Sequence, residues 1–167
     1  MSARRMLVAA RPVLALVTAA SMAAAVGQAR GEGQNTKLPA AVSKAIQDNR
    51  PGAEIDKVTV EKESGITFYD FEFKADQGEM DVADDGTVLD IATVIDMKDV
   101  PEPAATAIRT AAKGRAIKRV ERSEVRSEIV KEGRKGRLSK LSTPRYVYEA
   151  ELTNGEVEVT ADGKRIK

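Results

Sequence analysis

The chain has 167 residues with no Cys, His or Trp, and its formal net charge at pH 7 is +1. This composition excludes disulfide bonds, thiol nucleophiles, imidazole bases and metal sites built from His or Cys. Catalysis would depend on carboxylates, Lys, Tyr, Ser or Thr, and the sequence shows no nucleophile–base pair of these types. We therefore expect a protein that is not an enzyme and needs no cofactor.

The first 29 residues have the pattern of a secretion signal. Three arginines precede an uncharged run of small and apolar residues over 13–26. Small residues at the end of the run favour cleavage near Ala25 or Ala29. The run is short and rich in Ala compared with the ~20 strongly apolar residues of a membrane span. The sequence predicts a periplasmic or secreted protein with no stable membrane anchor after cleavage.

A helix is predicted to follow. Pro39 suits its first turn, where the missing N–H of a proline costs nothing. Val42 and Ile46 stand at helical spacing, and Pro51-Gly52 forms a stop signal. We expect one apolar side of this helix to pack against the rest of the fold.

Short strands are predicted after the helix. Tyr69, Phe71 and Phe73 alternate with charged residues, which gives a strand one buried and one solvated face. Asp85-Gly86 indicates a hairpin turn, because Gly tolerates the positive φ that such turns require. The first half therefore predicts a helix followed by antiparallel strands.

The second half of the chain repeats the first. Residues 38–61 align without a gap over residues 100–123, and residues 69–89 align over residues 146–166. The offset grows from 62 to 77 positions, so the second copy carries about 15 extra residues. The matched positions include Ile46 with Ile108, Tyr69 with Tyr146, and Gly86 with Gly163.

These patterns divide the chain into a signal over 1–29, a flexible leader over 30–37, and repeats over 38–99 and 100–167. The second repeat has an insertion near residues 124–143. Each repeat is predicted to form one helix and about four antiparallel strands. A unit of about 60 residues has a thin core. We therefore expect one α+β fold, in which the two repeats share a sheet and both helices lie on one face.

Charge is divided unequally between the two halves. Residues 30–99 carry 8 basic and 16 acidic residues, whereas residues 100–167 carry 16 basic and 10 acidic residues. The centre of the insertion, residues 131–140, reads KEGRKGRLSK, and we call it the basic hairpin. Alternation before it and its two glycines predict an extended, protruding hairpin.

The repeated motifs resemble those of the PepSY and PepSY-like domains. Each half has a helix opened by Pro, a stop and strands, and then the pattern Y-x-[F/Y]-E leading into G-E-x-x-V-x-x-D-G. The tandem arrangement is similar to that of the PepSY-like proteins of bacterial envelopes, whose fold is similar to that of the β-lactamase inhibitor protein. PepSY domains also occur in propeptides of thermolysin-type metallopeptidases, as chaperones or inhibitors. The resemblance thus implies non-catalytic binding of a protein or peptide and supplies no catalytic residue.

The basic hairpin is the first candidate binding site. Its basic side chains would dock on an acidic protein or peptide partner; they are Arg134, Lys135, Arg137 and Lys140. The alternatives are a solvated hairpin whose charges protect an exposed edge, and a homo-oligomer in which acidic and basic halves meet. No nucleic acid partner is expected, because the basic run contains no aromatic residue before Tyr146.

The tyrosines are the second candidate. Alternation favours packing roles for Tyr69, Tyr146 and Tyr148, and a recognition surface is the alternative if one face of the sheet is open.

A third, weaker candidate is a calcium site at Asp81, Asp84 and Asp85, as part of a soluble ligand- or calcium-binding protein. Gly86 and Asp85 fit an EF-hand type of loop that starts at Asp81, but Ala83 and Ala92 stand where ligands are required. Turn and strand chemistry explains these acidic residues more simply.

Overall fold

The computed structural model describes residues 37–75, 77–133 and 135–166. The secretion signal, residues 30–36 of the leader and Arg134 lie outside the described residues. In chain order the elements are α1 (Ala40–Asn49), β1 (Ile55–Glu63), β2 (Ile66–Phe73), β3 (Glu79–Ala83), β4 (Val88–Val94), η1 (Met97–Asp99), α2 (Glu102–Ala112), β5 (Ile117–Glu132), β6 (Lys135–Leu152) and β7 (Glu156–Thr160).

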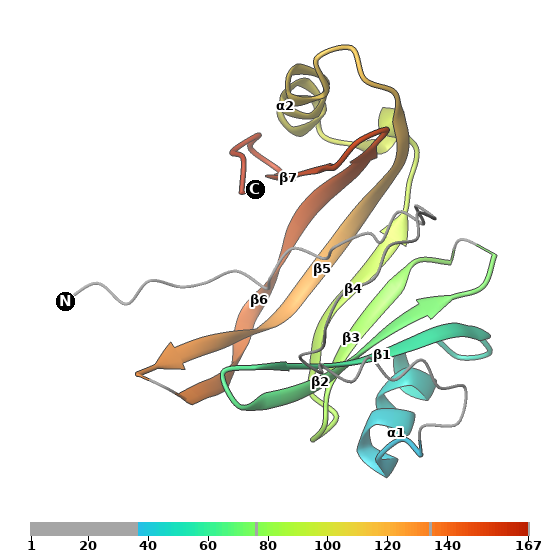
Figure 1. Cartoon of the computed structure of the whole chain (residues 1–167), viewed down its shortest axis with the longest axis vertical. Helices are drawn as coiled ribbons and strands as arrows, with labels where there is room; N and C mark the ends of the chain where they lie inside the picture. The colour runs from blue at the N-terminus through green and yellow to red at the C-terminus, as the bar shows by residue number, and fades with distance from the viewer. Residues whose placement is uncertain (1–36, 76, 134, 167) are drawn as a thin grey trace, which may run out of the picture.

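The strands form one antiparallel sheet in sequence order, from β1 at one edge to β7 at the other (Figure 1). Each strand is joined to the next by a turn, except that η1 and α2 stand between β4 and β5. The α+β class is therefore confirmed. Four strands follow α1, but only three follow α2, and the segment after β7 adds a single bridge between Val159 and Arg165. Within the described residues, no helix has the length and apolar character needed to span a membrane.

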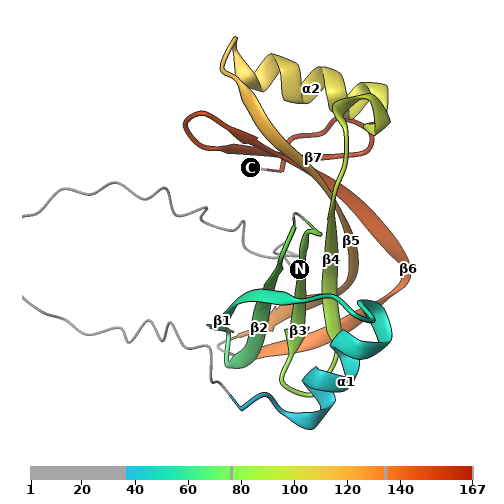
Figure 2. The same cartoon turned by 90° about the vertical axis from the view of Figure 1, so that its right-hand side faces the viewer.

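The register of the strands places both helices on the same face of the sheet. Met80 lies in the core under α1, and its row continues across the strands through Ile91 and Glu124 to Tyr146. Tyr148 is two residues further along β6, on the same face, and lies in the core under α2. The helices cover opposite ends of this face (Figure 2). We call it the helix face.

Each helix covers its own apolar cluster. Phe71 and Met80 under α1 are fully buried, as are Ile108 of α2 and Val159 beneath it. Both helices follow a proline, as the sequence predicts, because the first turn tolerates its missing N–H. The other residues of each cluster are the apolar side chains that alternate along the strands and point toward the helix.

The two predicted Asp-Gly turns lie against the first turns of the helices. Gly86 has a φ of 87°, and a Cβ atom there would lie 2.9 Å from the carbonyl oxygen of Ala41. Gly163 has a φ of 80°, and its Cβ would lie 2.6 Å from the carbonyl oxygen of Pro103. Ala41 and Pro103 occupy matched positions in the alignment of the two halves. Glycine is therefore required both for the turn and for the close approach of a helix.

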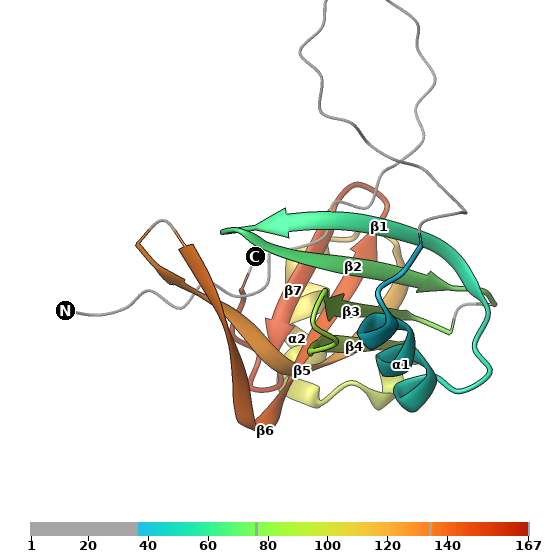
Figure 3. The same ribbon diagram turned by 90° about the horizontal axis from the view of Figure 1, so that it is seen from below.

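The β5–β6 hairpin is extended, as the sequence predicts, and it projects past the other strands in Figure 3, but it also contacts the turn between β1 and β2. The N–H of Gly136 donates to the carbonyl oxygen of Ser64, in the turn between β1 and β2, with an N···O distance of 2.6 Å. Figure 1 shows the hairpin beside this turn. Ile129, at the base of the hairpin, is 4% exposed and packs with Phe68 and Leu89 in a third apolar cluster. Burial of this apolar cluster stabilises the packing of the hairpin base against the sheet.

Candidate functional site

An exposed tyrosine lies on the helix face between the two helices. Tyr146 on β6 is 42% exposed, and the guanidinium carbon of Arg122 on β5 lies 5.4 Å from the centre of its ring. This distance suits a cation–π interaction, which orients both side chains. Strand alternation brings them together, because Arg122 is the direct cross-strand partner of Tyr148, two residues from Tyr146.

A chain of polar contacts continues from this tyrosine toward α1. Arg126 donates from Nε to Oε1 of Glu124 at 2.7 Å and from Nη1 to Oδ1 of Asn49, the last residue of α1. We call Arg122, Glu124, Arg126 and Tyr146 the Tyr146 patch.

The neighbouring Arg50 ties the end of α1 to the sheet. Its Nη2 donates to the carbonyl oxygen of Ala92 at 2.6 Å, and its guanidinium lies 5.6 Å from the ring centre of Phe73. Burial lowers the pKa of Arg50 from its ordinary value, and the charge of Glu121 opposes this effect. Arginine stays charged despite such a shift, so the border of the Tyr146 patch keeps a fixed positive charge.

The structure separates the tyrosines that the sequence groups together. Tyr148 is 6% exposed and belongs to the core under α2. Tyr69 is half-buried on β2 and stacks on Phe71, with 6.3 Å between ring centres. Tyr146 is therefore the most exposed of the three tyrosines. The alternation pattern places all three on one face but does not say where a helix covers that face.

The described basic residues of the hairpin are exposed. Lys135, Arg137 and Lys140 each lie at the surface, and Nε of Arg137 donates to Oε1 of Glu132 at 2.9 Å. This ion pair is exposed and contributes little to stability. The hairpin therefore carries accessible positive charge at the end of the sheet away from α2 (Figure 1).

The three acidic residues of the predicted calcium site do not converge. Asp81 is 2% exposed on the face opposite the helices, where its cross-strand neighbours are Asp70 and Asp90. Asp84 and Asp85 lie in the exposed turn after β3, and Oδ1 of Asp85 accepts a hydrogen bond from the N–H of Thr87. Among the described residues no group of three acidic side chains could hold a metal ion.

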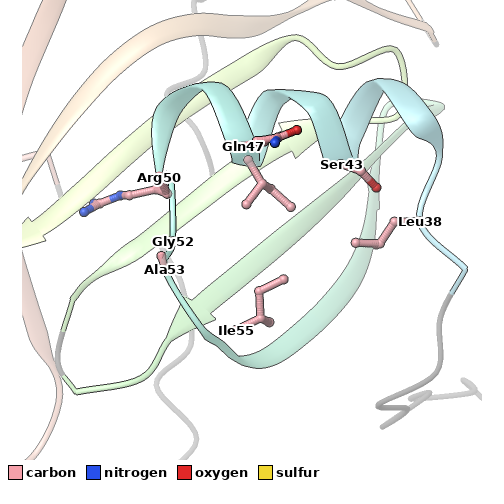
Figure 4. Close-up of a pocket in the computed structure, with 8 residues that line it drawn as sticks. Leu38, Ser43, Gln47, Arg50, Gly52, Ala53 and Ile55 are labelled. Atoms are coloured by element: carbon pink, nitrogen blue, oxygen red, sulfur yellow. The ribbon is translucent and has the colours of Figure 1, made fainter.

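A shallow hollow of about 280 Å³ lies between α1 and the start of β1 (Figure 4). It is smaller than most ligand sites, and it holds few converging polar groups. The residues that line it are Leu38, Ser43, Ile46, Gln47, Arg50, Gly52, Ala53 and Ile55. We assign it no ligand.

Sequence patterns name Tyr146 as a candidate but miss the charged members of the Tyr146 patch, Arg122, Glu124 and Arg126. The contact between Arg126 and Asn49 joins residues 77 positions apart, and neither belongs to a motif. The alternation of charges around Arg122 signals only a strand. The useful signal, an aromatic residue next to the arginine-rich strand, becomes visible once the register of β5 and β6 is known.

No family model matches the chain, and no curated protein matches it. Several solved structures resemble it. A candidate periplasmic protein from Bacteroides eggerthii is 12% identical, with a TM-score of 0.49, and the match covers 79% of this chain and 88% of that one. A DUF2874 family protein from Bacteroides ovatus is 12% identical, with a TM-score of 0.48 and coverage of 80% and 87%. A BLIP-like protein from Bacteroides fragilis is 13% identical, with a TM-score of 0.45 and coverage of 80% and 86%. At these values neither a family nor a function follows for this chain.

Proposed function

We propose that the chain is an exported, non-catalytic PepSY-like protein that binds a polypeptide partner. The observation that carries the proposal is the exposed ring of Tyr146, held against Arg122 between the two helices. Tyr and Arg are the residue types that most often dominate the energy of protein interfaces, because each combines a large contact area with directed polar groups. A partner that covers this pair would bury an aromatic ring whose orientation is already fixed.

Two further features support a polypeptide partner. The exposed Lys135, Arg137 and Lys140 of the basic hairpin would attract an acidic partner and speed its encounter. The matched contacts of Gly86 with Ala41 and of Gly163 with Pro103 support a duplicated helix-and-hairpin unit, the arrangement on which the PepSY resemblance depends. That resemblance favours restraint or chaperoning of a peptidase as the form of binding. The signal pattern in the first 29 residues supports export.

Site-specific photo-crosslinking tests the proposal. A photoreactive phenylalanine analogue replaces Tyr146 in the full-length chain, which is produced in its own bacterium and irradiated. We expect one discrete polypeptide adduct, because a specific interface places the same partner beside residue 146 in every complex. Mass spectrometry then identifies the partner, and a peptidase found there is assayed for inhibition by the purified chain.

The matched control places the same analogue at Thr110, which is exposed on α2 and lies outside the patch. The adduct should be absent at this position. It should also weaken when Arg122 is replaced by Ala in the crosslinking chain. The Tyr146 patch would be rejected as the binding surface if neither position gave a discrete adduct. It would also be rejected if both positions gave equal adducts.

A further inference from the structure

β1 is an edge strand with half of its backbone hydrogen-bonding groups turned outward. A two-residue turn joins it to β2, with positive φ at Ser64 (52°) and Gly65 (88°). In such a turn the flanking residues, Glu63 and Ile66, form a hydrogen-bonded pair. Bonded and non-bonded pairs alternate along an antiparallel ladder, so the outward N–H and C=O groups belong to Val58, Val60 and Lys62.

No described helix or strand covers this edge, which lies at the outer side of the sheet in Figure 3. Val60 is 48% exposed, the largest fraction among the exposed large hydrophobic side chains of the described residues. Glu61 and Lys62 are also exposed, and neither forms an ion pair within the part of the chain that the structure describes. An edge of this kind is a template for another strand.

The sequence of β1 is complementary to itself when read backward. Residues 56–62 read DKVTVEK. Pairing two such strands antiparallel about Thr59 sets every charge against its opposite and every apolar residue against another. The pairs are Asp56 with Lys62, Lys57 with Glu61, Val58 with Val60, and Thr59 with Thr59. Opposite charges, Thr–Thr pairs and β-branched pairs directly across an antiparallel ladder are all favourable.

The hydrogen-bond pattern and the side-chain pattern require the same register. Pairing about Thr59 sets Val58 opposite Val60, and both residues have outward backbone groups. These residues can therefore exchange N–H···O bonds with the second copy without breaking any bond to β2. A register shifted by one residue would place outward groups opposite inward ones.

We infer that two copies of the chain associate through β1, by antiparallel pairing about a two-fold axis at Thr59, into one continuous sheet. The two-fold symmetry closes the assembly at a dimer. The bulge at Asp56 limits the regular pairing to the five residues 57–61, with the Asp56–Lys62 pairs at its ends. Because a single pair of strands buries less area than a standard interface, the dimer is expected to be weak and concentration-dependent.

Sedimentation velocity of the signal-free chain, from low micromolar to several hundred micromolar, measures this association. We expect a monomer that converts to a dimer and no larger species. Glu61→Lys places like charges at both symmetric Lys57 contacts and should weaken the dimer about tenfold or more. Lys57→Glu should do the same. An equimolar mixture of the two variants should restore a dimer, since both contacts between positions 57 and 61 in the heterodimer then join Lys to Glu.

Two further variants separate strand pairing from net charge and from misfolding. Asp99→Lys makes the same charge change away from β1 and should leave the dimer unaltered. Val60→Pro removes an outward N–H that β2 does not use, and it should abolish the dimer while the far-UV spectrum is kept. A wild-type monomer at every concentration would overturn the inference. A dimer that resists both Glu61→Lys and Val60→Pro would also overturn it, as would open-ended growth from acidic-to-basic contacts.

Discussion

At some glycines with positive φ, an added Cβ atom would prevent two elements from packing against each other. Gly163 stands in the turn after β7, with a φ of 80° and the carbonyl oxygen of Pro103 at 2.6 Å from the site of a Cβ. Gly155, in the turn before β7, has a φ of 95° but no atom within 4 Å of that site. The two residues share the strain of the left-handed region and differ only in the space around them, so they form a matched pair.

We expect Gly163→Ala to lower the free energy of unfolding by about 2–4 kcal/mol, as the sum of left-handed strain and displacement of the α2 first turn. Gly155→Ala should cost about 1–2 kcal/mol, from the strain alone. Urea denaturation followed by circular dichroism measures both. Equal losses in the two variants would mean that the contact with Pro103 does not constrain the turn.

Asp162, in the same turn, has a lowered pKa, which predicts how the stability of the folded state depends on pH. The Thr160 hydroxyl donates to its carboxylate, and Lys164 Nζ lies 2.9 Å from Oδ2; these interactions lower the pKa of Asp162 from 3.8 to about 2. A lowered pKa means that the charged form stabilises the folded state. This contribution is complete above pH 3.8 and is lost as the pH falls toward 2.

Carbon-detected NMR of the Asp162 carboxyl measures its titration directly. The midpoint should lie near 2 in the wild-type chain and should rise toward 3.8 in Thr160→Val, which removes the hydroxyl that donates to the Asp162 carboxylate. Thr110→Val, on α2, serves as the control and should leave the midpoint unchanged. A midpoint at 3.8 in the wild-type chain would show that the turn is open in solution.

At the scale of elements, the basic hairpin tests how an insertion attaches to the sheet. Ile129 at its base is 4% exposed against Phe68 and Leu89, whereas the adjacent Val130 is only partly buried. Ile129→Ala should lower the free energy of unfolding by about 2–4 kcal/mol, because it leaves a cavity in a small cluster. Val130→Ala should cost less than about 1 kcal/mol. Thermal unfolding measures both, and near-zero losses for both would indicate a hairpin detached from the sheet.

The hairpin also marks the limit of what the sequence predicts about elements. Pro39, Pro101 and the two Asp-Gly turns are local signals, and they locate the starts of the helices and the turns correctly. The docking of Gly136 onto Ser64 joins residues far apart in the chain, and no local pattern encodes it. Tyr146 and Tyr148 show the same limit within one strand. Alternation correctly predicts that both lie on the same face of the sheet, but it does not predict that α2 buries only Tyr148.

At the scale of the whole molecule, one sheet joins two apolar clusters that have no common helix. β4 pairs with β5 over five residue pairs, Asp90 with Val125 to Val94 with Glu121, and carries the sheet from one cluster to the other. Arg126 adds a bond to Asn49 of α1, and Arg50 adds a bond to the carbonyl oxygen of Ala92. These links cross the boundary between the two halves, so loss of either cluster exposes surface on the other.

We therefore expect the two halves to unfold in one cooperative transition. The chain has no Trp, so Tyr69→Trp and Tyr146→Trp each create a single fluorescent reporter, the first beside the α1 cluster and the second two residues from the α2 cluster. In each variant, the urea midpoint from fluorescence should equal the midpoint from far-UV circular dichroism. Arg126→Ala, which removes the bond to Asn49, should lower both midpoints together. Separate fluorescence and dichroism midpoints in either reporter variant would mean that the halves fold as independent units and that the continuous sheet does not couple them.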